Sequence, residues 1–329
     1  MEKSLELICP AGTPAALQVA IDAGADVVYV GFRDETNARN FPGLNFSRQE
    51  LQSGIQYAHD RSRKVFVAIN TYAKAKAESL WHRAIDDAVF LQADAIILAD
   101  IGLLAYAKTN HPNARLHLSV QASASNPPSI NFYQKAFGIK RIVLPRVLSL
   151  EEIAALNQKI QIETEVFAFG GMCTMAEGRC SLSSYVTGQS PNQNGVCSPA
   201  SHVQYEHEDG RLITKLGGFT IDEYDKHESA GYPTLCKGRF TVENKTSYLF
   251  EDPVSLNVIG MLKDLIDAGV SALKIEGRQR SKAYVREVVT QFRQAIDALR
   301  SDPNAKTPDL SPLCEGQKTT RGAYDTQWQ

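Results

Sequence analysis

Short apolar runs, many of them rich in β-branched residues, alternate with longer segments of helical spacing along most of the chain. Five or six consecutive apolar residues are typical of strands that are buried on both faces, as in parallel sheets. Eight runs of this kind occur, at residues 5–9, 27–31, 65–70, 95–100, 116–121, 141–145, 165–170 and 272–277. The pattern therefore predicts eight strands with helices between them.

Signals at the helix ends agree with this alternation. Residues 126–137 begin with Asn126 as a candidate N-cap and with Pro127 at the first helical position. Gly24 and Gly138 stand where a helix ends before the next strand, a place that favours a left-handed backbone. The chain therefore reads as a repeated strand–helix unit.

The segment between the seventh and eighth runs, residues 171–252, is too long for a simple connection. Without it, about 250 residues are left, the usual size of a (β/α)₈ barrel. A doubly wound open sheet is the alternative, but no G-x-G-x-x-G loop follows the first run. We predict a TIM-like α/β barrel from residues 1–170 and 253–300, a cysteine-rich insertion at 171–252 after strand seven, and a surface tail at 301–329.

Composition and charge narrow the function classes. The 329 residues include 35 basic and 37 acidic ones, so the formal net charge is −2. A free-standing nucleic-acid binder would normally be basic, so we expect no direct contact with nucleic acid. No apolar run reaches the ~18 residues of a membrane span, and the N-terminus does not read as a signal peptide. We therefore expect a cytoplasmic protein without a transmembrane segment.

Four of the six cysteines, Cys173, Cys180, Cys197 and Cys236, lie in the insertion. Clustered cysteines in a reducing compartment are more often ligands or catalysts than disulfides. Their spacing lacks the paired knuckles of zinc ribbons, which favours an iron–sulfur cluster over zinc without excluding zinc. A third interpretation is four unrelated buried cysteines, but the many glycines and prolines around them argue against a packed core.

Polar residues follow several of the predicted strands, where barrel enzymes place their chemistry. The candidates are Asn70, Gln121, Arg146, Glu276 and Arg278. An arginine at such a position can bind a carboxylate through two parallel hydrogen bonds. The structural alternative is an ion pair, for example between Arg146 and Glu276 across the barrel mouth. The sequence does not decide between the two.

Several motifs along the chain resemble those of one known family: LICPAG, LSVQASASN, FAFGGMCTMAEGRC, GYPTLCKGR, ALKIEGRQRS and TTRGAY. They resemble the collagenase-like peptidase family of unassigned mechanism, in particular its members in oxygen-independent ubiquinone biosynthesis. The resemblance covers nearly the whole chain. It implies a [4Fe–4S] cluster with ligands at Cys173, Cys180, Cys197 and Cys236.

The same resemblance implies an activity and partners. It implies hydroxylation of ubiquinone precursors without dioxygen, as a heterodimer with the related subunit UbiV. Related members use prephenate as the oxygen donor, and a lipid-binding carrier, UbiT, is implied to present the quinone head group.

Other functions are open at this stage. The family name suggests a peptidase, but the sequence has no G-x-S-x-G elbow, no H-E-x-x-H helix and no assignable triad. A tRNA- or rRNA-modifying hydroxylase of the same family is a further alternative, against which the net charge of −2 counts. The last alternative is a scaffold whose cluster is only structural.

Overall fold

The computed structural model describes residues 5–191, 196–314 and 317–325. Its main sheet contains eight parallel strands in sequential order, and the last of them pairs with both the first and the seventh, which closes a barrel. The strands are β1 (Glu6–Pro10), β2 (Val27–Val30), β3 (Lys64–Ile69), β4 (Ala95–Leu98), β5 (Leu116–Leu118), β6 (Arg141–Val143), β7 (Glu163–Gly171) and β14 (Ala272–Ile275). The predicted (β/α)₈ barrel is therefore confirmed.

A helix follows each barrel strand, directly or after an inserted segment. These helices are α1 (Pro14–Asp22), α2 (Arg48–His59), α3 (Glu78–Phe90), α4 (Ile101–Asn110), α5 (Pro127–Phe137), α6 (Leu150–Asn157), α9 (Leu262–Asp267) and α10 (Lys282–Ser301). α5 begins as its sequence predicts, because the Asn126 side chain accepts a hydrogen bond from the Ser129 amide. The ring of helices buries its apolar stripes against the strands; in α10 the stripe centres on Val288, Val289 and Phe292.

The barrel interior is more polar than the apolar runs suggest. Arg141 lies inside it within ion-pair distance of Glu6 (2.7 Å), Glu163 (2.6 Å) and Glu165 (3.5 Å). The Lys274 ammonium group lies 2.6 Å from the second oxygen of the fully buried Glu165. Buried charges are tolerated when they are paired and hydrogen-bonded, and here the pairs join β1, β6, β7 and β14 across the barrel.

These ion pairs predict a pH dependence of stability. Burial alone would raise the pKa of Glu6 and Glu163, but the neighbouring cations hold both below the ordinary value of 4.5. Arg141 acts on both carboxyl groups, together with Lys64 on Glu6 and Arg115 on Glu163. A carboxyl group with a lowered folded-state pKa stabilises the protein above its unfolded-state pKa and loses that contribution as the pH falls through the folded-state value. We expect the free energy of unfolding, measured with urea, to fall as the pH is lowered from about 5 to about 3.

The fall should be shallower in Glu6→Gln, which has no carboxyl group to protonate at that position. The matched control is Glu243→Gln at an exposed position, which should follow the native protein. An unchanged slope in Glu6→Gln would contradict this assignment.

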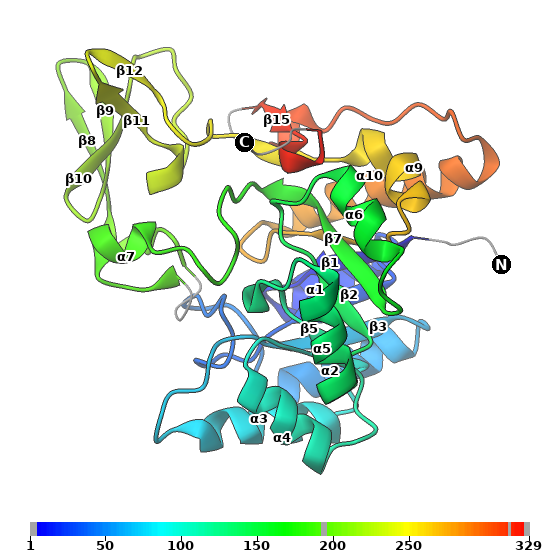
Figure 1. Ribbon diagram of the computed structural model, residues 1–329. Helices are drawn as coiled ribbons and strands as arrows, with labels where there is room; N and C mark the ends of the chain where they lie inside the picture. Colours follow the sequence, from blue (N-terminus) through cyan, green and yellow to red (C-terminus); the bar gives the residue numbers. More distant parts are fainter. Residues whose placement is uncertain (1–4, 192–195, 315–316, 326–329) are drawn as a thin grey trace.

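The cysteine-bearing segment forms a lobe of its own after β7. It contains α7 (Leu182–Thr187), an antiparallel sheet of β8 (Val203–Glu208), β9 (Arg211–Leu216) and β10 (Phe219–Tyr224), and the hairpin of β11 (Arg239–Val242) and β12 (Lys245–Tyr248). In Figure 1 this lobe, green to yellow, projects to the left of the barrel. A small apolar core of Val186, Leu216 and Ile221 holds it together.

The chain returns to the barrel through β13 (Ser255–Asn257), which pairs antiparallel with the end of β7. β15 (Thr319–Thr320) then pairs with β13 and extends the sheet beyond the barrel. The buried Tyr324 hydroxyl donates a hydrogen bond to the Phe167 carbonyl (2.8 Å). The C-terminal segment thus packs against β7, the strand from which the lobe leaves the barrel.

Candidate functional site

A cavity of about 230 Å³ opens at the carboxyl end of the barrel strands. All five polar residues singled out in the sequence line it: Asn70, Gln121, Arg146, Glu276 and Arg278. They come together because the carboxyl ends of parallel strands meet at the same edge of a barrel. Arg39, Lys274 and Arg280 also line the cavity, whereas the carboxylates that do so are Glu177 and Glu276. Cations therefore outnumber anions among the described lining residues.

Arg146 is held between two carboxylates. Its guanidinium group donates hydrogen bonds to Glu276 and Glu177, and it stacks 3.4 Å from the centroid of the Phe167 ring. Burial would lower the pKa of Arg146, but Glu276 and Glu177 raise it above its usual value. The ion pair between Arg146 and Glu276, the structural alternative in the sequence analysis, is therefore present.

Glu276 accepts a second hydrogen bond, from the Arg39 guanidinium group at 3.3 Å. Arg39 belongs to the long connection between β2 and α2, which reaches over the barrel mouth. Although burial acts in the opposite direction, Arg146 and Arg39 lower the pKa of Glu276. Glu276 is therefore an ionised carboxylate that orients two guanidinium groups.

Arg278 has a different environment. Its guanidinium group is buried, donates to the Asn37 side-chain oxygen (2.7 Å) and lies 5.2 Å from the centroid of the Tyr29 ring. In the described part of the chain, no carboxylate lies within ion-pair distance of it. Burial lowers the pKa of Arg278 to about 10, although Tyr29 and Glu276 act against this. A buried cation without an anionic partner can bind an anionic ligand in the cavity.

The two amide side chains have different roles. The Asn70 side-chain oxygen accepts a hydrogen bond from the Ala38 amide (3.0 Å), so Asn70 positions the connection that carries Arg39. The Gln121 side-chain oxygen is buried and has no hydrogen-bond partner among the described residues. Because an unsatisfied buried acceptor is costly, Gln121 is a candidate to bind a donor of the ligand.

Glu177 is a site residue that the sequence pattern does not indicate. It lies between Cys173 and Cys180, and its buried second oxygen has no hydrogen-bond partner in the part of the chain that the structure describes. Burial raises its pKa, although Arg146 acts in the opposite direction. The sequence signal for this position is Gly178, the residue after Glu177. In the structure its φ angle is +82°, and a Cβ atom there would lie 2.0 Å from the Gln121 carbonyl oxygen. This loop therefore packs directly on the barrel.

Lys274 is a second site residue that the pattern hides, because it stands inside the apolar run at 272–277. Lys274 and Glu276 are two residues apart at the end of one strand, and both line the cavity. Strict alternation of side chains along a strand was the available signal.

The cysteine segments are tied to one another through residues beside the thiols. The Tyr232 hydroxyl donates to the Ser198 carbonyl (3.1 Å), and the Ser198 hydroxyl lies 3.4 Å from that of Thr234. These bonds join the segment of Cys197 to that of Cys236. The loop before Cys197, residues 192–195, lies outside the described residues.

The four thiols share one partly buried region. None forms a disulfide, and each is intermediate in exposure. Burial raises the pKa of Cys173 to about 12 and that of Cys236 to about 11, and the nearby thiols Cys197 and Cys173, respectively, also raise them. Burial likewise raises the pKa of Cys197, with Cys236 and Cys180 adding to the effect. These effects link Cys236 to each of the other three thiols.

The donor set fits a [4Fe–4S] cluster in kind and number, since such clusters are held by four cysteine thiolates. In the described positions, no three His, Cys, Asp or Glu side chains are gathered so that they could hold a metal ion.

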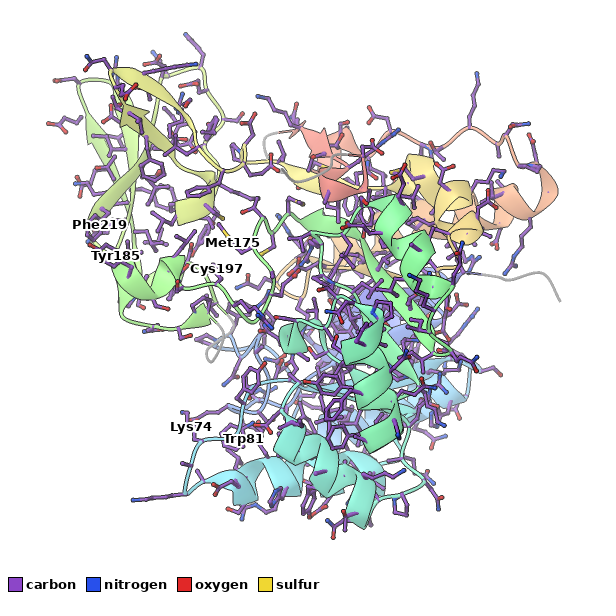
Figure 2. The ribbon with its side chains drawn as sticks, in the orientation of Figure 1. Lys74, Trp81, Met175, Tyr185, Cys197 and Phe219 are labelled. Atoms are coloured by element: carbon purple, nitrogen blue, oxygen red, sulfur yellow. The ribbon has the colours of Figure 1, made fainter. Side chains whose placement is uncertain are left out.

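This cysteine region adjoins the cavity. Figure 2 labels Cys197 and Met175 between the lobe and the barrel. Arg39 lowers the pKa of Cys197 and Arg146 lowers that of Cys173, against the larger effect of burial. Both arginines line the cavity. The same two guanidinium groups thus face the thiols and the cavity.

Comparison with known proteins decides the family. The family model of peptidase family U32 matches residues 12–324. The chain belongs to peptidase family U32.

Relatives in the U32 family carry names of two kinds. The chain is 32% identical over 315 residues to the tRNA hydroxylation protein P of Haemophilus influenzae, covering 89% of this chain and 67% of that protein. It is 31% identical over 300 residues to the 23S rRNA 5-hydroxycytidine C2501 synthase of Escherichia coli, covering 90% of this chain and 40% of that protein. It is 29% identical over 304 residues to a collagenase of Porphyromonas gingivalis, covering 89% and 66%. This chain thus spans about two thirds of the first relative's length.

One relative is named a collagenase, but the lining of the cavity does not supply a peptidase triad. The described residues that line the cavity include no histidine, so they do not supply the general base of a serine or cysteine peptidase triad.

Among the described helices, none is long and apolar enough to cross a membrane.

Proposed function

We propose that this U32 protein is the UbiU subunit of an oxygen-independent hydroxylase that acts on ubiquinone precursors as a heterodimer with UbiV. The observation that carries the hydroxylase is the shared position of Arg39 and Arg146, which line the cationic cavity at the barrel mouth and also act on Cys197 and Cys173. The motifs quoted in the sequence analysis support the assignment to ubiquinone. The names of the tRNA- and rRNA-hydroxylating relatives support hydroxylation as the reaction.

In this proposal Cys173, Cys180, Cys197 and Cys236 hold a [4Fe–4S] cluster, which supplies one-electron chemistry when bound. Arg146 and Arg39 orient Glu276 and keep it ionised at the boundary between the thiols and the cavity. Glu177 closes this boundary from the lobe side, where it pairs with Arg146.

The cavity is suited to a small anionic ligand. Its excess of cations favours a carboxylate, and its volume of about 230 Å³ suits a single-ring molecule better than a larger one. Prephenate, a dicarboxylate, is the proposed oxygen donor, and Arg278 is the proposed partner of one carboxylate. The isoprenoid tail of the quinone precursor stays outside the cavity, held by the carrier UbiT.

Replacing Arg278 by alanine should weaken prephenate binding about 10- to 100-fold, because a hydrogen bond to a charged group contributes about 1.5–3 kcal/mol. The protein should stay folded, since the change removes a buried cation rather than one partner of an ion pair. Isothermal titration with prephenate measures the effect. The affinity of Arg278→Lys for prephenate should lie between those of the native protein and of Arg278→Ala. Arg286→Ala, at an exposed position on α10, is the control. Unchanged binding in Arg278→Ala would remove Arg278 from the ligand site.

RNA hydroxylation is the second candidate function, and the names of the relatives favour it directly. A net charge of −2 favours the quinone substrate instead. A deletion strain grown without oxygen separates the two. Loss of ubiquinone with normal tRNA and rRNA nucleosides by mass spectrometry supports the proposal. Loss of hydroxylated nucleosides with normal ubiquinone supports the RNA candidate.

A further inference from the structure

A buried lysine forms part of the wall of the cavity. Lys274 lies near the end of β14, is only 7% exposed and lines the cavity. Its register neighbours are Ile8 on β1 and Phe167 on β7, which are both buried and apolar. The amine of Lys274 thus reaches the cavity from an apolar part of the barrel.

Two side chains hold this amine in place. It donates a hydrogen bond to the Glu165 carboxylate at 2.6 Å, and it lies 3.8 Å from the centroid of the Tyr29 ring. Glu165 pairs in register with Ala272, two residues before Lys274, so it lies on the side of the lysine away from the cavity mouth. The ion pair explains how a lysine can be buried here, and it leaves the amine between a carboxylate and the cavity.

A second cation lies near the same ring. The guanidinium group of Arg278 is 5.2 Å from the centroid of the Tyr29 ring. Burial lowers the pKa of Lys274; Glu165 acts against this effect, whereas Arg278 and Arg141 add to it. A lysine with a lowered pKa has more neutral, nucleophilic amine at neutral pH. Buried lysines of this kind can form Schiff bases with carbonyl compounds.

We propose that Lys274 forms a protonated Schiff base with the carbonyl carbon of a 2-oxo acid whose carboxylate is bound by Arg278. The inference deepens the proposed function and rests on it for the choice of ligand. Prephenate carries a pyruvyl side chain, in which a ketone adjoins a carboxylate. The cavity would therefore select its ligand by a covalent bond to the ketone as well as by charge.

The step balances without an oxidant or a reductant. The Lys274 nitrogen forms a bond to the carbonyl carbon, the carbonyl oxygen leaves as water, and both protons of that water come from the ammonium group. The iminium nitrogen keeps one positive charge, so Glu165 keeps a cationic partner. The Glu165 carboxylate, 2.6 Å from the nitrogen, is placed to accept a proton from it and to return it.

A structural ion pair is the competing explanation, since Lys274 and Glu165 join β14 to β7 whether or not a ligand binds. The two roles require different chemistry of the side chain. Either a lysine or an arginine can pair with Glu165, but only a primary amine can form the Schiff base. Lys274→Arg therefore separates the two roles.

The test is reductive trapping on the full-length protein, purified without oxygen. The protein is incubated with phenylpyruvate, which has the pyruvyl side chain of prephenate, and then with cyanoborohydride, which reduces a Schiff base to a stable secondary amine. Mass spectrometry of peptides should place the adduct on Lys274. Phenyllactate, with a hydroxyl group in place of the ketone, should give none. The adduct should be lost in Lys274→Arg and kept in Lys245→Met, a control at an exposed position on β12.

Three results would overturn the inference: no binding of phenylpyruvate by isothermal titration, no adduct on Lys274 at a saturating concentration, or an undiminished adduct in Lys274→Arg. If Lys274→Arg does not fold, the double variant Lys274→Met with Glu165→Gln, which leaves no uncompensated charge in the pair, takes its place. An adduct on Lys274 in a protein that holds no iron would refute the proposed hydroxylase and still support the Schiff base.

Discussion

Replacing any one of Cys173, Cys180, Cys197 and Cys236 by alanine is expected to lower both the iron content of the protein and the ubiquinone made without oxygen. Each variant removes one of four partly buried thiols, and electrostatic effects link Cys236 to each of the other three. Iron and acid-labile sulfide measure the first effect, and complementation of a deletion strain measures the second. We expect near-complete loss of both.

The stability of the lobe should change with the cluster. A bound metal centre supplies folding free energy to the segment that holds it, on the order of 10 kcal/mol in the case of structural zinc. Losing one ligand should therefore speed proteolysis within residues 182–248 and leave the barrel intact. Among the described residues, the apolar core of the lobe is small: Val186, Leu216 and Ile221, with Val203 and Leu235 packed against it.

Cys314→Ala is the matched control for the cysteine variants. Its thiol donates to the Leu310 carbonyl (3.3 Å) in the C-terminal segment, so its loss should cost about 1 kcal/mol and no iron. Full iron content and normal ubiquinone in any of the four ligand variants would contradict the assignment of that cysteine. Loss of iron in Cys314→Ala would contradict the choice of ligands.

Arg146→Met should destabilise the protein by about 3–5 kcal/mol, because it removes the cation from a buried ion-pair network. Among the described residues, Glu177 would lose its ion-pair partner, and Glu276 would keep its ion pair with Arg39. Urea unfolding measures the effect. The control is Arg33→Met, whose ion pair with Glu50 is exposed and should contribute about 0–1 kcal/mol.

The double variant Arg146→Met with Glu177→Gln tests the cause. Neutralising Glu177 removes the uncompensated charge, so the double variant should regain part of the lost stability. If Arg146→Met stays within about 1 kcal/mol of the native protein, the network is not the source of stability that its burial indicates.

The fold was readable because its signals are local. Each of the eight apolar runs contains or overlaps one barrel strand, and Asn126 and Pro127 mark the start of α5. The meeting of Asn70, Gln121, Arg146, Glu276 and Arg278 follows from parallel topology alone.

What the sequence could not show depends on contacts between distant segments. Arg39 reaches the cavity from a connection without regular structure, and Glu177 comes from the lobe. Arg146 forms ion pairs with Glu177 and Glu276, whereas no described carboxylate lies within ion-pair distance of Arg278. This difference depends on the side chains that lie opposite each guanidinium group in the folded protein. The polar barrel interior was hidden because Arg141, Glu165 and Lys274 each stand within or beside an apolar run.

Metal and sulfide analysis of the native protein, purified without oxygen, shows directly whether the four cysteines beside the cationic barrel mouth hold an iron–sulfur cluster. We expect about four iron and about four acid-labile sulfide per chain, without stoichiometric zinc. One zinc per chain with neither iron nor sulfide would contradict it.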